Sequence, residues 1–306
     1  MKALLLASAL LLAATLSNAA EPQGDTRAHD PTLLIGEGSV QHVFTTGAGL
    51  QRLKSVDAGK TWHREAPVFS EASKPAWWAQ AVPAHQGLDV WAPKLFRHAG
   101  KVWVLYSIST FGKNTSAIGL ASAASPDAAE WKDEGLVVAS QPSDNFNAID
   151  PDLLIDGGKL WLSYGSFWGG IRLTELDGQT LRPTGETRFI ARRKGGIEAP
   201  TIVRRGEWYY LFVSHDLCCR GVESTYNIRV GRAKSVWGPY LDKDGVDMME
   251  RGGTLIEEGG PRWKGPGHQD VVGDLIVRHA YDAEDGGKPH LRLGSLRWAP
   301  DGWPSL

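Results

Sequence analysis

The sequence contains few sulfur atoms and no strong excess of charge. Only two cysteines occur among its 306 residues, at the adjacent positions Cys218 and Cys219. Adjacent cysteines exclude a framework of disulfides, and a bridge between neighbours requires strained geometry, so we interpret both as structural. The formal net charge of −2 gives neither the basic surface of a nucleic-acid-binding protein nor an acidic solvating tail. A globular chain without a nucleic acid partner is expected.

Long hydrophobic runs are also lacking, except at the N-terminus. Residues 1–20 combine Lys2, an apolar run and the small residues Ser17 and Ala19, which is the pattern of a secretory signal peptide. A membrane anchor is disfavoured because the run is short for a span, and no other stretch is apolar enough to cross. We predict a signal peptide over residues 1–20, one domain over residues 21–306, no membrane partner and a secreted or periplasmic location.

No amphipathic helix is recognisable after the signal peptide, whereas the 13 Trp and 36 Gly residues suit stacked sheets joined by hairpins. The repeating unit is clearest over residues 146–168. There Asp150 and Pro151 open an apolar strand, Gly157 and Gly158 make a tight turn, and an aromatic strand returns. This unit is a β-hairpin.

Five copies of this unit follow one another along the chain. They begin at His29, Trp91, Ile149, Glu198 and His268, about 50 to 70 residues apart, and the fifth copy is degenerate. Each copy continues into an outer pair of strands, as at residues 116–122 and 226–232. Four strands at this period are typical of propeller blades. We therefore predict an all-β fold, a five-bladed β-propeller.

The first copy also contains residues 55–62, SVDAGKTW, which match the S-x-D-x-G-x-T-W pattern of an Asp-box hairpin. In such a hairpin the Ser and Asp side chains bond to the backbone of the turn. We interpret the motif as a structural turn at the outer edge of a blade and assign it no chemistry.

The repeat alignment also predicts which residues meet at the centre. The first strand of every propeller blade lines the central channel, so matched positions form a ring. Two adjacent layers of that ring are expected to contain His29, Trp91, Ile149, Glu198 and His268, and then Asp30, Ala92, Asp150, Ala199 and Gln269. A single Asp before Pro is often only a turn former. Three carboxylates at matched places repel one another, however, and would not gather without a use.

Three carboxylates without a nucleophilic Ser or Cys, a phosphate loop or a dense metal-ligand cluster suit glycoside hydrolysis. That reaction needs one carboxylic acid to protonate the leaving oxygen and one carboxylate to activate water or attack the sugar. A third carboxylate nearby raises the pKa of the acid. The aromatic residues Trp91, Phe111 and Trp168 offer flat surfaces for sugar faces, although each could equally pack between blades.

The ordered motifs resemble one family, the five-bladed propeller arabinanases of glycoside hydrolase family 43. The resemblance extends from His29 to the C-terminus and rests on HDPTLL, VWAPKLF, FGKNTSAIGLA, FNAIDPDLLID, WLSYGSFWGGI, GGIEAPTIV, YYLFVSHDLCCRGVESTYNIRVGR and GPGHQDVV. It implies a secreted enzyme that cleaves internal α-1,5-L-arabinofuranosidic bonds of arabinan, with arabinan as its partner. We expect a monomer and no organic cofactor.

By motif, the resemblance implies that Asp30 is the general base, Glu198 the general acid and Asp150 the group that tunes and orients the acid. The family inverts the anomeric centre, which implies about 6.5–9.5 Å between the carboxyl groups of Asp30 and Glu198. His268 matches a histidine that lies on the propeller axis, often beside a cation such as calcium. Since calcium prefers oxygen ligands, such a site would be formed largely by water.

Four further residues, Trp91, Phe111, Asn147 and Ser166, match family positions close to the substrate. Asn147 could donate to a sugar hydroxyl or cap a turn. Cys218 and Cys219 also match a family pattern, which implies a structural role or a place in a subsite wall. His215 departs from that pattern, since an aromatic residue is more usual there, and its role stays open.

Three alternatives remain in view. An exo-acting arabinanase, α-L-arabinofuranosidase or β-xylosidase of the same family would use the same carboxylates with different loops around the mouth. A sialidase would need an arginine cluster and a tyrosine nucleophile at the axis and several Asp-boxes, whereas this chain has one Asp-box and no Arg or Tyr in the predicted ring. A non-catalytic sugar-binding propeller is disfavoured by the presence of all three carboxylates.

Overall fold

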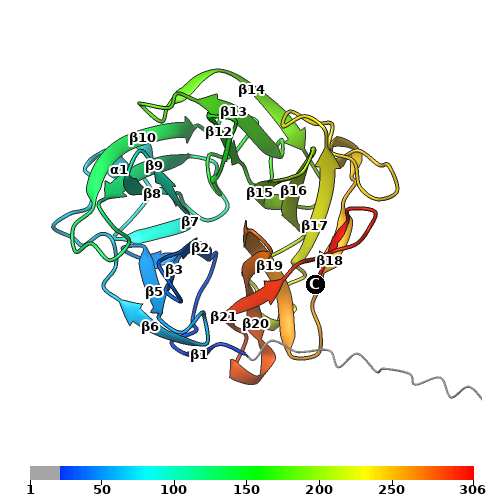
Figure 1. Cartoon of the computed structure of the whole chain (residues 1–306). Coiled ribbons are helices and arrows are strands. Elements are labelled where there is room, and N and C mark those ends of the chain that lie inside the picture. Colours follow the sequence, from blue (N-terminus) through cyan, green and yellow to red (C-terminus); the bar gives the residue numbers. More distant parts are fainter. Residues whose placement is uncertain (1–20) are drawn as a thin grey trace, which may run out of the picture.

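The computed structural model describes residues 21–306, so the predicted signal peptide lies outside the described residues. Five antiparallel sheets stand around one central axis, as Figure 1 shows. The predicted five-bladed β-propeller is confirmed. Within residues 21–306, no helix has the length and apolar character needed to cross a membrane.

The first three blades each place four antiparallel strands side by side from the axis outwards. Blade 1 contains β2 (Thr32–Ile35), β3 (Gln41–Thr45), β5 (Gln51–Ser55) and β6 (Thr61–Glu65), with β1 (Gln23–Gly24) parallel to β6. Blade 2 contains β7 (Asp89–His98), β8 (Lys101–Ile108), β9 (Ser116–Ala123) and β10 (Lys132–Ser140), with β4 (Gly47–Ala48) beside β7. Blade 3 contains β11 (Asp152–Asp156), β12 (Lys159–Tyr164), β13 (Ile171–Leu176) and β14 (Pro183–Ala191).

The remaining blades complete the ring. Blade 4 contains β15 (Ile197–Arg205), β16 (Trp208–His215), β17 (Asn227–Ala233) and β18 (Thr254–Glu257). Blade 5 contains only β19 (Trp263–Val272), β20 (Leu275–Asp282) and β21 (Lys288–Ser295). The other elements are α1 (Trp77–Ala81), a C-terminal hairpin of β22 (Arg297–Trp298) and β23 (Pro304–Ser305), and the short 3-10 helices Gly221–Glu223, Met248–Glu250 and Ala283–Asp285.

The N-terminal segment closes the ring at blade 5. Residues 26–28 lie beside β21, where the Leu291 N–H donates to the carbonyl of Thr26 (2.7 Å) and the Ala28 N–H donates to the carbonyl of Pro289 (3.3 Å). The segment therefore takes the place of a fourth strand. This pairing joins the first and last parts of the described chain and covers an edge that would otherwise be open to another molecule.

The short helix α1 contributes to the core between blades 1 and 2. Its Trp78 is buried against Phe69 and Tyr106, with the rings edge to face, and its indole N–H donates to the Tyr106 hydroxyl (3.2 Å). Large aromatic side chains fill the wedge between neighbouring blades. Their burial stabilises the fold by about 25 cal/mol for each Å² of apolar surface removed from water. The blades are thus held together mainly by side chains on the faces of their sheets.

The predicted turns are present. The turn between β11 and β12 uses Gly157 (φ 57°) and Gly158 (φ 80°), a conformation that favours glycine at both places. In the Asp-box, the Ser55 hydroxyl accepts the N–H of Gly59 (3.0 Å), and Asp57 accepts the N–H groups of Lys60 and Thr61. The interpretation of the Asp-box as a structural turn is confirmed.

Each blade begins with one residue in the left-handed backbone conformation, which lies at the entrance to the channel. These residues are Asp30 (φ 54°), Ala92 (φ 45°), Asp150 (φ 57°), Ala199 (φ 54°) and His268 (φ 49°). In β7, β15 and β19 the same place is a bulge, where the pairing with the second strand shifts. Conformations of this kind are costly for residues with a Cβ and cluster at functional sites.

This pattern corrects the alignment of the fifth repeat. His268 matches Asp30 and Asp150, whereas the sequence analysis placed Gln269 at that position. The fifth copy has no proline after this residue and no acidic residue at it, so nothing local fixed its register. Its true place brings His268 into the same layer as two of the three carboxylates.

Two residues further along each inner strand, a second layer crosses the axis. Its members are Thr32, Lys94, Asp152, Thr201 and Asp270. The Lys94 ammonium lies 2.6 Å from Asp152 Oδ1 and 2.7 Å from Asp270 Oδ1. Asp270 Oδ2 also accepts the Thr32 hydroxyl (2.8 Å), and Asp152 Oδ2 accepts the backbone N–H of Ile202 (2.9 Å). We call these five residues the axial ion-pair layer, and it links all five blades.

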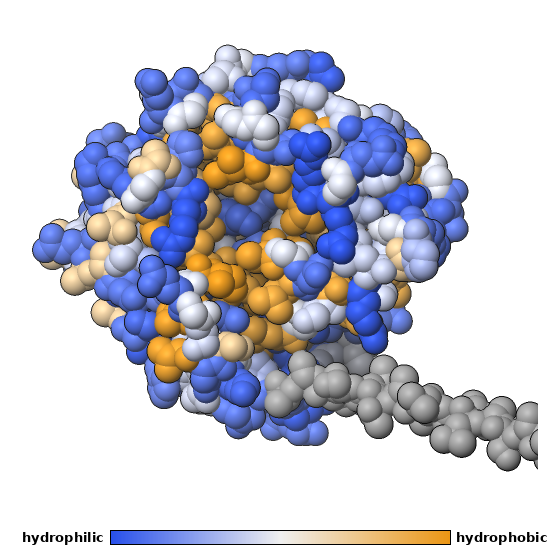
Figure 2. All heavy atoms as spheres, in the orientation of Figure 1, coloured by the Kyte–Doolittle hydropathy of each residue, from blue (hydrophilic) through white to orange (hydrophobic). Residues whose placement is uncertain are grey.

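The centre of the ring is hollowed at the surface. In the face that Figure 2 presents, hydrophobic residues surround a central hollow, and hydrophilic residues lie further out. The outer rim is therefore solvated, whereas the centre offers mixed polar and apolar surface.

Candidate active site

One cavity of about 780 Å³ opens at the end of the axis where the left-handed residues lie. All five blades contribute to its wall. It contains every residue predicted for the site, namely Asp30, Trp91, Phe111, Asn147, Asp150, Ser166, Glu198 and His268. Ring closure thus brings together residues that lie up to 238 positions apart in the sequence.

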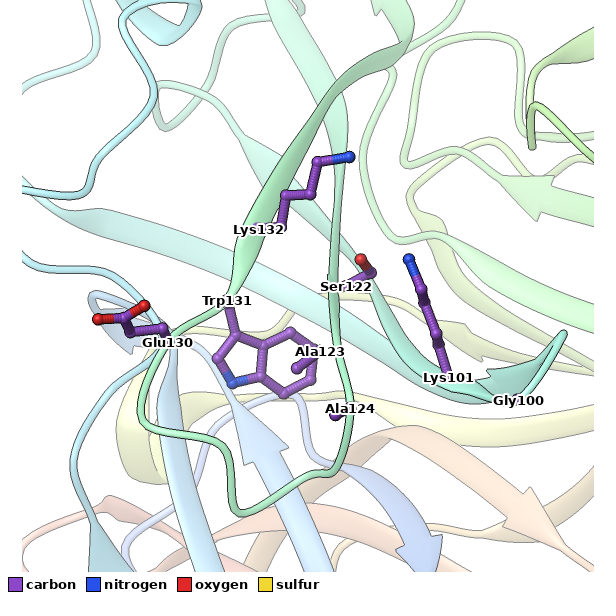
Figure 3. A pocket seen from close by; sticks show the side chains of 8 residues that line it. All are labelled: Gly100, Lys101, Ser122, Ala123, Ala124, Glu130, Trp131 and Lys132. Carbon is purple, nitrogen blue, oxygen red and sulfur yellow. The ribbon is translucent and has the colours of Figure 1, made fainter.

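A second hollow lies on the outer strands of blade 2, as Figure 3 shows. It is lined by Lys101, Ser122, Glu130, Trp131 and Lys132 among others, and its volume is about 440 Å³. It contains one carboxylate and no histidine, so it lacks the pair of carboxyl groups that acid–base chemistry on a sugar requires. The axial cavity is the candidate active site.

Asp30 is held by four neighbouring side chains. Its Oδ2 accepts the Thr46 hydroxyl (2.5 Å) and lies 2.8 Å from His29 Nδ1, while its Oδ1 lies 3.1 Å from His268 Nδ1. Its backbone N–H donates to His279 Nδ1 (3.1 Å). Burial by itself would raise the pKa of Asp30, but His268 and His29 outweigh burial and hold that pKa well below its ordinary value. Asp30 is therefore ionised.

The pKa of Glu198 is shifted in the opposite direction to that of Asp30. Glu198 lies on β15, where its Oε2 accepts the Ser166 hydroxyl and its Oε1 accepts the Tyr226 hydroxyl, both at 2.5 Å. These two hydrogen bonds favour the ionised form, yet burial outweighs them and raises the pKa of Glu198. Glu198 therefore keeps a proton to a higher pH than Asp30 does. Ser166, which was predicted to contact substrate, holds this carboxyl group.

Asp150 is fixed beside the strand that carries Glu198. Its Oδ2 accepts the N–H of Ala199 (3.1 Å), and its own N–H donates to the Ser107 hydroxyl (3.1 Å). Burial raises the pKa of Asp150 to about 8, and the charges of Glu198 and Asp30 add to this rise. The three carboxyl groups thus share fewer than three negative charges near neutral pH.

His268 supplies the compensating positive charge. Burial disfavours its charged form, but Asp30 and then Asp150 outweigh burial and raise the pKa of His268 to about 9. Its backbone N–H donates to the Ser214 hydroxyl (2.9 Å), which fixes the residue against β16. His268 is therefore an imidazolium beside the ionised Asp30.

Aromatic residues stand at the mouth of the cavity. Phe111 is 78% exposed and Trp168 is 47% exposed, so their faces are free to contact a ligand rather than packed between blades. The Trp91 indole N–H donates to Asp89 Oδ2 (2.7 Å). Asn147 is buried, and its side-chain oxygen has no hydrogen-bond partner within the described part of the chain.

Cys218 and Cys219 form a disulfide with each other, which the sequence analysis did not expect. Cys218 is half-buried and Cys219 is exposed, and both lie in the wall of the cavity, so the implied place in a subsite wall agrees with their position. His215 lies elsewhere. It is buried behind the wall, 2.9 Å from Arg193, and burial, with Arg193 and Arg229, lowers its pKa to about 3.

Sequence analysis missed Thr46, Tyr226, His279 and Tyr281, which support the carboxylates from outside the inner ring. His279 and Tyr281 lie on β20, the second strand of blade 5, and Tyr226 just precedes β17, the third strand of blade 4. The alignment considered only first strands. The one local signal was the spacing of His279 and Tyr281 in RHAYD, residues 278–282, since residues two apart on a strand share one face.

The residues around His268 do not fit a calcium ion held directly by the protein. Calcium takes six to eight oxygen ligands, whereas His268 offers one nitrogen beyond the one that faces Asp30, and the Asp30 carboxylate already faces three donors. In a second group with metal-ligand spacing, His29, Asp30 and His279, hydrogen bonds already use both nitrogens of His29, the Asp30 carboxylate and Nδ1 of His279, and Nε2 of His279 has no partner among the described residues. We assign no catalytic step to a metal.

Known proteins resemble this chain over most of its length. The model of the family described as glycosyl hydrolases family 43 matches residues 20–304. The chain is 51% identical over 286 residues to the extracellular endo-α-(1→5)-L-arabinanase 1 of Bacillus subtilis (strain 168), covering 90% of this chain and 87% of that protein. It is 40% identical over 303 residues to the extracellular exo-α-(1→5)-L-arabinofuranosidase of Cellvibrio japonicus (strain Ueda107), covering 91% and 86%.

A solved structure extends this similarity to three dimensions. The GH43 endo-arabinanase from Bacillus licheniformis superposes with a TM-score of 0.89 at 48% identity, and the match covers 94% of this chain and 99% of that one. A similarity of this extent includes all five blades and the axial cavity. On the family match and these relatives, the chain belongs to glycosyl hydrolases family 43.

Proposed function

We propose that this protein is an exported, inverting endo-1,5-α-L-arabinanase that cleaves internal bonds of arabinan, the polysaccharide of pectin side chains. One observation carries the proposed chemistry. In a single cavity, the pKa of Asp30 is held well below its ordinary value, while the pKa of Glu198 is raised. A base that is ionised and an acid that is protonated at the same pH are what a single displacement on a sugar requires.

Asp30 acts as the general base from its Oδ1 atom. Its Oδ2 already accepts two hydrogen bonds, whereas among residues 21–306 Oδ1 has one partner at hydrogen-bond distance, His268, with His279 Nδ1 further away at 3.6 Å. The remaining acceptor site on Oδ1 holds the attacking water. His268 keeps Asp30 ionised, so the carboxylate is ready to take a proton from that water.

Glu198 acts as the general acid. It gives its proton to the departing glycosidic oxygen as the water attacks the anomeric carbon from the opposite face. Burial, with the charge of Asp30 in addition, keeps the acid protonated, and Asp150, fixed at the backbone of Ala199, orients the neighbouring segment that carries Glu198. Because water attacks in one step, the product has the inverted anomeric configuration.

The choice of arabinan follows the relatives. The endo-arabinanase of Bacillus subtilis shares 51% of aligned residues with this chain, more than the 40% shared with the exo-acting relative of Cellvibrio japonicus. Phe111 and Trp168, exposed at the mouth, offer surfaces for sugar rings. Both relatives are named extracellular, which agrees with export; residues 1–20 would direct it, and we propose that the exported protein acts as a monomer.

Kinetics on two substrates separate the roles of the two carboxylates. On linear 1,5-α-L-arabinan, Glu198→Gln and Asp30→Asn are each expected to lose about 10²–10⁴-fold in kcat. On an aryl arabino-oligosaccharide with a nitrophenolate leaving group, Glu198→Gln should lose far less, because that group leaves without a proton. On the aryl substrate Asp30→Asn should lose as much kcat as it does on linear arabinan. Equal losses for both variants on both substrates would contradict the assignment.

Glu175→Gln is the matched control, since Glu175 lies on β13 of blade 3 and pairs with Lys159 outside the cavity. It is expected to leave kcat unchanged. Early products of the wild type from linear arabinan should be mixed oligosaccharides whose new reducing ends appear first as the β-anomer. A single short product from the start would favour the exo-acting alternative, and no cleavage would favour a sugar-binding propeller.

A further inference from the structure

His29 connects the carboxylate of Asp30 to a tyrosine on another blade. Its Nδ1 lies 2.8 Å from Asp30 Oδ2, and its Nε2 lies 2.8 Å from the Tyr281 hydroxyl. The Tyr281 hydroxyl is in turn 2.8 Å from the backbone nitrogen of Cys219, in the disulfide of the cavity wall. Four groups from blade 1, blade 5 and the loop after β16 therefore form one chain of hydrogen bonds.

The direction of this chain follows from its last member. A backbone N–H can only donate, so the Tyr281 oxygen accepts from Cys219. The single hydrogen of the Tyr281 hydroxyl is then free for His29 Nε2, which accepts it. His29 consequently has its own hydrogen on Nδ1 and donates it to Asp30 Oδ2. In this arrangement each hydrogen bond of the chain has one donor and one acceptor.

His279 restricts the movement of His29. The two imidazole rings are stacked, with centroids 4.0 Å apart and planes at 22°. His279 is fully buried and accepts the backbone N–H of Asp30 at its Nδ1 (3.1 Å). His29 is therefore held on one face by His279 and at both ring nitrogens by hydrogen bonds.

We propose that His29 and Tyr281 are positioning residues, which fix the orientation of the Asp30 carboxylate and tie it to the Cys218–Cys219 loop. With Oδ2 held by His29 and Thr46, Oδ1 is left facing the water that attacks. The Cys218–Cys219 loop also lines the cavity. The same hydrogen bonds therefore position both this part of the cavity wall and the carboxylate of Asp30. This inference rests on the proposed role of Asp30 as general base.

Removing the Tyr281 hydroxyl tests the network. Tyr281→Phe is expected to lower kcat on linear arabinan about 10-fold, the scale of one lost hydrogen bond near a charged group, with KM changed by less than about twofold. The matched control is Tyr210→Phe. The Tyr210 hydroxyl is also buried but donates to the carbonyl of Gly302 outside the cavity (2.6 Å), so its loss should leave kcat unchanged. A kcat of wild-type size in Tyr281→Phe would overturn the proposal.

Two replacements of His29 separate its two nitrogens. The amide nitrogen of Asn falls near the place of Nδ1, so His29→Asn keeps the donor to Asp30 but loses Tyr281. The amide of Gln reaches the place of Nε2 instead, so His29→Gln loses the donor to Asp30. We expect His29→Asn to match Tyr281→Phe and His29→Gln to fall clearly lower in kcat. Equal kcat values for His29→Asn and His29→Gln would contradict the donor role.

A double-mutant cycle distinguishes linkage from general damage. Adding Tyr281→Phe to His29→Asn should reduce kcat no further, because the connection is already cut. Additive losses would show that the two residues act independently and would overturn the proposal. Thermal unfolding of every variant identifies any that fail to fold, and the His29 pair decides the question if Tyr281→Phe is one of these.

Asp30→Asn in the same series separates this inference from the proposed function. If Asp30→Asn keeps its activity, the role of Asp30 as base is wrong and the network has nothing to position. If Asp30→Asn is inactive while Tyr281→Phe and both His29 variants match the wild type, the base is correct and the network alone is wrong.

Discussion

Two adjacent layers on the propeller axis use the same residue types in opposite ways. In the axial ion-pair layer, one ammonium at Lys94 serves the buried carboxylates of Asp152 and Asp270. Above it, Asp30 and Asp150 of the next layer and the neighbouring Glu198 share the imidazolium of His268. Burial is similar in both layers, and so is the chemistry of the side chains. The ratio of acidic to basic groups differs.

The difference appears in the protonation states. Burial opposes the charged form of Lys94, but the two carboxylates outweigh it and raise its pKa, so this cation is permanent. The pKa of Asp270 is lowered, because Lys94 and the donors Leu33 and Thr32 outweigh burial. Asp152 has one backbone donor and its pKa stays raised by burial. In the upper layer burial, which His268 offsets only in part, raises the pKa of Asp150 to about 8, and the charges of Glu198 and Asp30 add to this rise.

The comparison separates a layer built for stability from one built for chemistry. A satisfied ion-pair network fixes the inner strands, whereas an unsatisfied group of carboxyl groups retains a proton that can be transferred. We expect substitutions to show this contrast. Removing a charge from the axial ion-pair layer should destabilise the protein, whereas removing a carboxylate from the layer above should reduce the repulsion between like charges and stabilise it.

The largest effect on stability is expected for Lys94→Met. Without the ammonium, Asp152 and Asp270 are two buried like charges with no cation, which should cost about 3–5 kcal/mol of unfolding free energy. Urea denaturation followed by tryptophan fluorescence measures the loss. Lys159→Met is the control, since Lys159 is 57% exposed in its pair with Glu175 and should cost less than about 1 kcal/mol. Similar losses of unfolding free energy for Lys94→Met and Lys159→Met would contradict the stabilising role of the axial ion-pair layer.

The same substitution in the two layers should have effects of opposite sign. Asp150→Asn removes a group whose pKa of about 8 in the fold exceeds its ordinary value of 3.8. That group favours folding fully below pH 4, and its contribution is lost as the pH rises to 8, so the advantage of Asn grows over this range. At pH 8 we expect a gain on the order of 1 kcal/mol, or roughly 2–4 °C in Tm.

Asp270→Asn should instead destabilise the protein at pH 8, because Lys94 loses one of its two partners. Calorimetry of both variants from pH 4 to pH 8 gives the comparison. A lower Tm for Asp150→Asn than for the wild type at pH 8 would contradict the account of the upper layer, as would any rise for Asp270→Asn.

Tyr226→Phe should shift the pH dependence of activity rather than abolish it. The Tyr226 hydroxyl favours the ionised form of Glu198 and thus opposes the rise in its pKa. Its removal raises the pKa of Glu198 further, so the loss of kcat at alkaline pH should begin about one pH unit higher. Rates measured from pH 5 to pH 10 test this. A shift to lower pH would show that Tyr226 stabilises the protonated acid instead.

The smallest effect is expected far from both layers. Ser55→Ala removes the hydroxyl that accepts the N–H of Gly59 in the Asp-box, at a cost of about 1 kcal/mol. The activity should not change, because the turn lies at the outer edge of blade 1. A change in kcat without a change in stability would contradict this expectation and would mean that the outer turn of blade 1 is coupled to the active site.

The arrangement of blades and the meeting of the carboxylates could be predicted from the sequence because both depend on repetition. Each hairpin has local signals, such as Asp150-Pro151 before an apolar strand and Gly157-Gly158 after it. Once the copies close into a ring, matched positions must converge. Where the repeat lost its markers, at His268, the predicted register was wrong by one residue.

The supporting residues could not be predicted in this way, since their partners lie on other blades. His279 reaches Asp30 across 249 positions in the sequence, and Tyr281 reaches His29 across 252. Lys94 was visible in the second copy, but nothing in its neighbourhood indicated that Asp152 and Asp270 would meet it on the axis. The bond between Cys218 and Cys219 likewise depends on the conformation of their loop.

The sequence by itself therefore determined the number of blades, the family and the three carboxylates, because these follow from local patterns and their period. Only the tertiary structure decided which carboxyl group keeps a proton. Protonation depends on how far each group is removed from water and on which charges come from the other blades, as Asp30 and Asp150 show with shifts of opposite sign at the same place in their repeats.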